Sequence, residues 1–138
     1  MAYWLMKSEP HVYPWDKLVR EQRAAWDGVR NHQAAANLRA MRTGDEALFY
    51  HSGDDKAVIG IMKIVKPAYP DPGDDTGKFV MVDVAPVRSF TRPVTLREIK
   101  ADKILGGMAM VRQSRLSVSK VTDGEWRQLL RLEQSPHD

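Results

Sequence analysis

Residues 47–65 read ALFYHSGDDKAVIGIMKIV, a segment that specifies two strands and the turn between them. Ala47–His51 is aliphatic and aromatic, which is typical of a strand. Residues 52–56 combine serine, glycine and aspartate and predict a turn, after which Val58–Val65 is the returning strand. Gly60 lies inside that second strand and indicates a bulge or a tight bend, as small barrels need. The segment therefore predicts a curved pair of strands.

The flanking segments supply further short strands. Residues 3–8 (YWLMKS) are an apolar run ended by Glu9-Pro10, which suits a buried strand. Residues 79–84 have strand composition, and residues 116–118 alternate as a strand does. Residues 67–77 contain three prolines, two glycines and three aspartates, so they predict a loop.

Helix signals lie between these strands without a regular strand–helix–strand alternation. Pro14 is compatible with the first turn of a short helix, and Asn31 is a typical N-cap of the next. Thr95-x-x-Glu98 and Thr122-x-x-Glu125 are capping boxes that predict two later helices. This order predicts an α+β fold with a mixed or antiparallel sheet, compatible with a small barrel flanked by helices.

Length and composition predict one globular domain over residues 1–138, because 43% of the residues are hydrophobic and 28% are charged. No apolar run approaches the roughly 20 residues of a spanning helix, so no membrane partner is expected. The N-terminus lacks the pattern of a secretory signal, and the absence of cysteine excludes disulfides. We therefore expect a cytoplasmic protein, associated with the nucleoid if it is prokaryotic. Since one domain fills the chain, we expect whatever follows recognition to come from an effector partner or from the act of binding itself.

The positive charge is concentrated in one part of the chain. The net charge is only +3, yet within residues 86–120 basic side chains outnumber acidic ones by eight to two. Such a span is typical of a surface that binds a polyanion, and Lys100, Lys103 and Arg112 are the predicted phosphate contacts. The alternative is a solvated face whose charges are balanced by acidic groups that folding brings close.

Catalytic and metal signatures are largely missing. The sequence has no glycine-rich phosphate loop, nucleophile elbow or His-Glu-x-x-His spacing. His51 with Asp54 is the best pair for a metal, but no cysteine or second nearby histidine completes a site. We expect neither a metal nor a cofactor.

Trp26 stands directly before the polar segment 27–31. An indole in that position suits stacking on a flat base whose edge is bonded by neighbouring polar groups. The alternative is a tryptophan that only plugs the end of a barrel. Lys7-Ser8, His51-Ser52 and Ser114-Arg115 end or precede strands, so in a barrel they would converge on one rim.

Several segments in order resemble the EVE domain family. They are Tyr3–Pro10, Trp26-x-Gly28-Val29-Arg30-Asn31, Gly44-Asp45, Phe49-Tyr50-His51-Ser52, Ala68–Pro72 and Arg115-Leu116-Ser117-Val118. The resemblance implies a PUA-like fold, a small β-barrel flanked by helices, similar in plan to the YTH domain that reads methylated adenine in RNA. It also implies a reader of a modified base, either modified cytosine in DNA or a modified base in RNA, with no cofactor.

The resemblance also assigns site residues. Trp26 would be one wall of the base pocket, Lys7, Ser8, His51 and Ser52 would line it, Arg30 and Asn31 would flank it, and Arg115 and Ser117 would contribute from the late strand. One alternative is an enzyme acting on RNA or modified nucleotides, with His51 as base and Lys7 as electrostatic stabiliser. Another is a small-molecule sensor or protein-interaction module. The identity of the base, the choice of DNA or RNA and the oligomeric state stay open.

Overall fold

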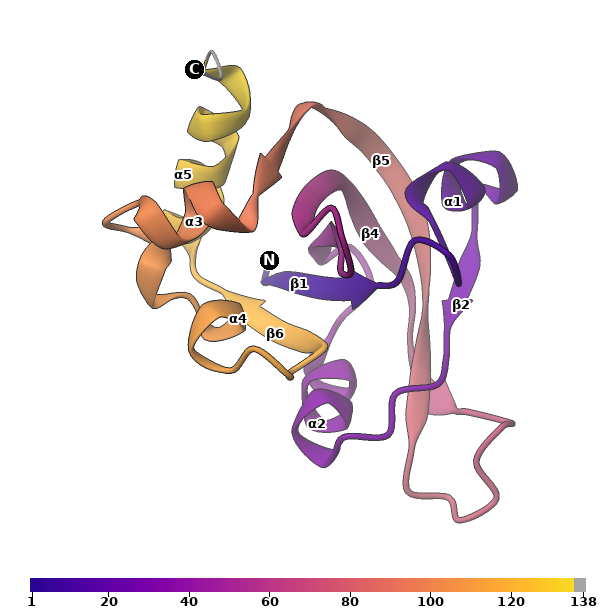
Figure 1. The fold of residues 1–138 in the computed structure, drawn as a ribbon. Helices are drawn as coiled ribbons and strands as arrows, with labels where there is room; N and C mark the ends of the chain where they lie inside the picture. Colours follow the sequence, from indigo (N-terminus) through magenta and orange to yellow (C-terminus); the bar gives the residue numbers. More distant parts are fainter. Residues whose placement is uncertain (136–138) are drawn as a thin grey trace.

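The hairpin predicted from residues 47–65 lies at the centre of a six-stranded mixed sheet in the computed structural model, which describes residues 1–135 (Figure 1). The strand order is β2-β5-β4-β3-β1-β6. The strands are β1 (Tyr3–Ser8), β2 (Ala24–Trp26), β3 (Glu46–His51), β4 (Ala57–Pro70), β5 (Val80–Thr95) and β6 (Val118–Val121). The helices are α1 (Trp15–Glu21), α2 (His32–Ala40), α3 (Leu96–Ala101), the 3-10 turn η1 (Leu105–Gly107), α4 (Ala109–Arg112) and α5 (Asp123–Gln134). The predicted α+β class is confirmed.

The parallel pairing of β1 with β3 positions the site. Lys7 lies opposite Tyr50, and Ser8 lies opposite His51. Because parallel strands end at the same edge of a sheet, these four residues lie together at one edge, as the sequence predicted for the strand ends. The other strand pairs are antiparallel.

The central strands are irregular where the sequence indicated a bend. The β4–β5 register shifts between Val58 and Gly60, and the β3–β4 register shifts between Phe49 and Tyr50. A Cβ atom on Gly60 would lie 2.5 Å from the Trp15 ring, so only glycine fits there. Strands β2 and β6 remain the two edges of the sheet among the described residues. Closure into a barrel therefore stays a prediction.

Two boundaries predicted from the sequence are wrong. The loop expected at 67–77 is shorter, because β4 continues to Pro70 and pairs Tyr69 with Met81 and Pro70 with Val80. Pro67 is tolerated since it falls in a register shift, where no ladder hydrogen bond is required of it. The strand expected at 116–118 begins only at Val118, because the Leu116 N–H donates to Gln113 in a turn.

Alternating side chains of the central strands β1 and β3 face two separate cores. In β1, Trp4 and Met6 pack in a first core with residues of α1 and α2, whereas Leu5 packs in a second core beneath α3, α4 and α5. This division follows from the two-residue repeat of a strand. The helical caps were correctly predicted: Asn31 accepts from Ala34 N at 2.9 Å, and the capping boxes at Thr95 and Thr122 both form.

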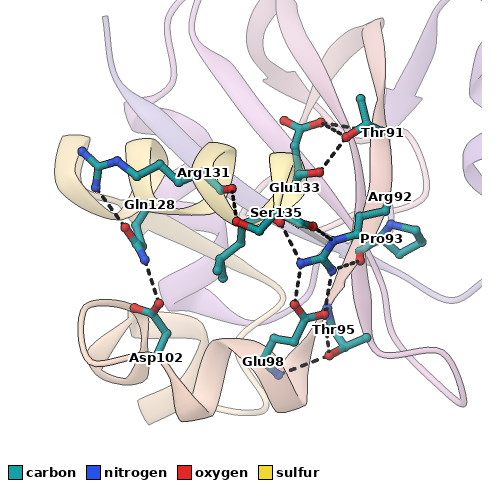
Figure 2. A network of polar contacts seen from close by, with 11 residues as sticks. Thr91, Arg92, Pro93, Thr95, Glu98, Asp102, Gln128, Arg131, Glu133 and Ser135 are labelled. Carbon is teal, nitrogen blue, oxygen red and sulfur yellow. Dashed lines mark hydrogen bonds and ion pairs between the residues drawn. The ribbon is translucent and has the colours of Figure 1, made fainter. Parts of the chain in front are cut away.

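A polar network holds the last helix against β5 (Figure 2). Arg92 forms a two-point ion pair with Glu98, at 3.0 and 2.9 Å, and also donates to backbone carbonyls at the end of α5. Arg88 forms a second such pair with the buried Glu133, at 2.7 and 2.6 Å. Two of the eight basic residues of the span 86–120 are therefore internal clamps, because their charges are taken up by Glu98 and Glu133. The other six are exposed and form no ion pair within residues 1–135: Arg97, Lys100, Lys103, Arg112, Arg115 and Lys120.

Candidate nucleic-acid interface

A hollow of about 430 Å³ opens beside the end of β1, within the 300–1,000 Å³ typical of ligand pockets. Its walls come from residues 7–9, from Val12 and Tyr13, and from residues 24–28 of β2 and the loop that follows. We call it the tryptophan pocket. Val12, Ala24 and Ala25 give it apolar surface, while Glu9 and Asp27 place carboxylates in its wall. A flat ligand with a polar edge suits such a lining.

Trp26 is both a core residue and a wall of this pocket. It ends β2, is 9% exposed, and meets the Phe49 ring edge-on, with 5.5 Å between ring centroids. It is therefore more buried than a loop-edge residue, and its stacking on a base stays a prediction. The indole N–H of Trp4 donates to Asp45 and that of Trp15 to Ser89, whereas no acceptor within residues 1–135 takes the N–H of Trp26. That N–H is not sealed in the core, so it is free for a ligand.

Tyr13 is a second aromatic wall that sequence reasoning missed. The turn after β1 returns the chain, because the Tyr13 N–H donates to Glu9 O at 2.9 Å and the Ser8 hydroxyl donates to Tyr13 O at 2.6 Å. The Tyr13 hydroxyl donates to Glu21 at 2.6 Å, and burial followed by this bond raises the pKa of the phenol well above its usual value. The one local sign in the sequence was Pro10, which indicates a turn that brings residue 13 back beside Ser8.

The loop after Trp26 is held by Asp71, a second residue missed from the sequence. Its carboxylate is 3% exposed and accepts from Gly28 N at 2.9 Å, Arg30 Nη1 at 3.0 Å and Gly73 N at 2.8 Å. The Gly28 bond is the largest cause that lowers the pKa of Asp71, so the group is ionised at neutral pH. Arg30 braces this loop through Asp71, and its predicted place beside the base stays a prediction.

His51 is engaged inside the protein. Its Nε2 accepts from Trp15 N at 3.1 Å, and its side chain is 12% exposed. Burial lowers the pKa of His51, with Asp55 and Asp16 opposing, so the ring is neutral at pH 7. A neutral ring that accepts at Nε2 carries its proton on Nδ1, and no lone pair remains for a general base. The geometry gives the hydrolase alternative no support.

Two further hollows follow, the first of which adjoins the tryptophan pocket. The lysine hollow, about 250 Å³, is lined by Lys7, Tyr50, Ser52, Gly53, Lys56, Leu96, Lys100, Met110, Val111 and Ser114. The arginine groove, about 340 Å³, is lined by Asn31, Gln33 and residues 112–116. Lys7 belongs to both the tryptophan pocket and the lysine hollow, and Ser114 belongs to both the lysine hollow and the arginine groove. The Lys7 ammonium donates to Ser114 O at 2.9 Å and joins the three hollows into one path.

The predicted site residues fall into groups along this path. Lys7, Ser8 and Trp26 line the tryptophan pocket, Ser52 and Lys100 line the lysine hollow, and Asn31, Arg112 and Arg115 line the arginine groove.

Three other predicted residues are placed differently. His51 is bound to Trp15, and Ser117 accepts from Lys7 N through its carbonyl at 2.9 Å. Lys103 is exposed beyond the end of α3. The functional roles of all these residues stay predictions.

Neither a metal cluster nor a membrane span is found in the described part of the chain. Within residues 1–135, no three histidine, aspartate or glutamate side chains gather where they could hold a metal ion. Over the same residues, no helix has both the length and the apolar character needed to cross a membrane.

The chain matches known proteins along nearly its whole length. The EVE domain model matches residues 2–132. Thymocyte nuclear protein 1 of Mus musculus is 40% identical, over 96% of this chain and 74% of the mouse protein. A Rhodopseudomonas palustris protein solved by NMR is 46% identical with a TM-score of 0.92, over 99% of this chain and 97% of that one. Human THYN1, solved in complex with DNA containing 5-methylcytosine, is 37% identical with a TM-score of 0.90, over 99% and 100% of the two chains.

A more distant likeness concerns the fold alone. The YTH domain of Zygosaccharomyces rouxii MRB1, solved with N6-methyladenosine RNA, aligns with a TM-score of 0.59 at 14% identity. The alignment covers 99% of this chain and 87% of that domain. The similarity of plan expected from the sequence is therefore confirmed.

Proposed function

The chain belongs to the EVE domain family, and from this premise we propose that it is a reader of modified bases in nucleic acid. The observation that carries the proposal is the tryptophan pocket, which Trp26 and Tyr13 line and which is linked through Lys7 to the lysine hollow and from there through Ser114 to the arginine groove. The human relative solved with 5-methylcytosine DNA supports modified cytosine as the leading ligand. A modified base in RNA is the second candidate. In this proposal residues 1–138 act as one domain.

The pocket offers chemistry for each part of a methylated cytosine. Stacking on an aromatic side chain contributes about 1–3 kcal/mol per base, and the indole N–H can donate to an acceptor on the base edge. The carboxylates of Glu9 and Asp27 can accept from the exocyclic amino group of cytosine. Val12, Ala24 and Ala25 can cover the methyl group, and burying one such group contributes about 0.8 kcal/mol. The methyl group alone should therefore give about a fourfold preference.

The base must leave its stack to enter the pocket. Extrusion costs a few kcal/mol and is least costly from a strand that is already single. One small pocket recovers little more than this cost, so phosphate contacts must supply much of the affinity. Lys100 lines the lysine hollow, Arg112 and Arg115 line the arginine groove, and Lys103 is exposed three positions after Lys100 in the chain. These four are the proposed phosphate contacts.

Reversing the charge of Arg112 and Arg115 together, as Arg112→Glu and Arg115→Glu, should weaken modified and plain strands by similar factors. Each phosphate contact contributes about 0.7 to the salt slope of single-strand binding, so the double variant should lower the slope by about 1.4. Fluorescence anisotropy at several salt concentrations measures this. The matched control reverses Lys63 and Arg127, which are exposed on β4 and α5. An unchanged slope in the first variant, or an equal change in the control, moves the binding face elsewhere.

The proposal is tested by competition binding of short strands that differ in one base. Plain strands compete with strands carrying 5-methylcytosine in DNA or N6-methyladenosine in RNA, at low and at physiological salt. We expect saturable binding with at least a fourfold preference for one modified strand and no conversion of the ligand. Equal affinity for modified and plain strands contradicts a reader, and product formation indicates an enzyme.

A further inference from the structure

A tyrosine hydroxyl without a protein partner faces the lysine hollow. Tyr50 is 3% exposed and lines this hollow, and no residue within 1–135 hydrogen-bonds its hydroxyl. Burial is the one cause that raises the pKa of Tyr50, to about 12, so the group is a neutral donor. Within residues 1–135, the Ser119 hydroxyl is the one side-chain polar atom that is fully buried and has no hydrogen-bond partner. The Tyr50 hydroxyl also has no partner, so it is not fully buried. The Tyr50 hydroxyl is therefore open to the hollow.

The rest of the hollow is rich in donors for an anion. Lys7, Lys56 and Lys100 contribute three ammonium groups. Ser52 also lines the hollow, and its hydroxyl donates to Ser8 O at a long 3.4 Å. The Lys7 ammonium lies 5.8 Å from the centre of the Tyr50 ring and gives one hydrogen bond to Ser114 O, so it has N–H donors to spare.

The acidic groups nearby do not cancel this charge. Asp55 borders the neighbouring hollow, which it shares with Lys56 and Lys100. It lies 3.9 Å from the His51 ring and its side chain is 69% exposed, so it faces solvent. Glu98 of α3 is paired with Arg92.

Lys56 is held in an unusual backbone conformation at this edge. Its φ is 39°, in the left-handed region that residues other than glycine, asparagine and aspartate seldom adopt. Its carbonyl accepts from Leu96 N at 2.8 Å, which ties the turn after β3 to the start of α3. Backbone of this kind is retained where the surrounding structure fixes it, often at ligand sites.

We propose that the lysine hollow binds a phosphate group of the strand directly beside the base held in the tryptophan pocket. Phosphate oxygens accept hydrogen bonds and attract ammonium groups, which matches the Tyr50 hydroxyl and the three lysines. The Ser52 hydroxyl would join them by leaving its long bond to Ser8 O. Lys7 lies in the wall of both cavities, so the two ligand groups belong to adjoining parts of one nucleotide. This inference rests on the proposed function and moves Ser52 from the base pocket to the phosphate site.

The test uses a variant that can hardly disturb folding. Tyr50→Phe keeps the buried ring and removes only a hydroxyl that has no protein partner, so its unfolding curve should match the parent. Lys100→Gln removes one of the three charges. The control is Lys63→Gln, an exposed lysine on β4 six residues from Ala57 and so about 20 Å along the strand.

Each protein is titrated with single strands in which one phosphate beside the recognised base is replaced by a neutral methylphosphonate. A nucleoside and its 5′-monophosphate form a second pair, which separates a free phosphate from one within a strand. Tyr50→Phe should weaken the natural strand about tenfold, the loss typical of a hydrogen bond to a charged group. When the neutral methylphosphonate stands at the phosphate that Tyr50 contacts, Tyr50→Phe and the parent should bind the strand with equal affinity. Lys63→Gln should bind every strand as the parent does.

The outcomes separate this inference from the proposed function. If Tyr50→Phe and Lys100→Gln weaken every strand equally, whichever phosphate is neutral, or have no effect, the phosphate site is wrong while the reader proposal stands. If both variants show the expected dependence but modified and plain strands bind equally, the phosphate site stands and the reader proposal fails. If Tyr50→Phe weakens binding of the 5′-monophosphate but not of the strand, the occupant is a free nucleotide and the inference is overturned. A parent protein that binds no strand contradicts both.

Discussion

Replacing Trp26 by leucine should remove the preference for a modified base and weaken binding of the modified strand by about 10–100-fold. The expected loss follows from the 1–3 kcal/mol that one stacked base contributes, together with loss of the free indole N–H. Leucine fills part of the space beside Phe49, whereas alanine in this core position should cost about 3–5 kcal/mol of stability. Competition between modified and plain strands measures the preference.

Trp26→Phe is the matched control, because it retains an aromatic ring while it loses the N–H and the larger bicyclic surface of the indole. It should keep a reduced preference, and both variants should show cooperative thermal unfolding. A folded Trp26→Leu protein with its preference intact would show that Trp26 is not a wall of the base pocket. The Trp would then be a structural plug, as one sequence interpretation held.

Replacing Arg88 by methionine should lower the free energy of unfolding by about 2–3 kcal/mol. The change leaves the Glu133 carboxylate, whose side chain is fully buried, without its ion-pair partner. Losing one partner of a buried pair costs about 3–5 kcal/mol, and the 41% exposure of Arg88 and the bond from Thr91 N to Glu133 reduce that figure. Chemical denaturation measures the change. The salt slope of strand binding should stay the same, because Arg88 is an internal clamp.

The double variant Arg88→Met, Glu133→Leu separates the lost ion pair from lost packing. It should recover part of the stability, since it leaves no buried charge unpaired. If the single variant is as stable as the parent, the clamp contributes nothing. If it lowers the salt slope as the Arg112 and Arg115 variant does, Arg88 contacts phosphate instead.

The features predicted correctly from the sequence are those set by near neighbours. The N-cap at Asn31 and the capping boxes at Thr95 and Thr122 each depend on a residue three positions away. The curvature at Gly60 also left a local sign, although its cause, the Trp15 ring against the strand, is distant in sequence. Strand ends were harder, because β4 extends past Pro67 only where β5 pairs with it.

The site was predicted only in part because its supports are long-range. Asp71 holds Gly28 from 43 positions away. It lies in the family-like segment Ala68–Pro72, but nothing in that segment indicates that its carboxylate reaches residue 28. Tyr50 looked like one more core aromatic, and only the fold shows that its hydroxyl opens on a hollow. Charge counting has the same limit, since Arg92 and Arg112 look alike in sequence but one is an internal clamp and the other is exposed.

The central claim is that a modified base enters the tryptophan pocket, and the methyl protons of the ligand report on it directly. A single strand carrying one 5-methylcytosine with an isotope-labelled methyl group is followed by NMR as the protein is added. The account predicts an upfield shift of the methyl signal from the ring of Trp26, with cross-relaxation to protons of Trp26, Tyr13 or Val12. A methyl signal that stays unshifted while the strand is fully bound would contradict it.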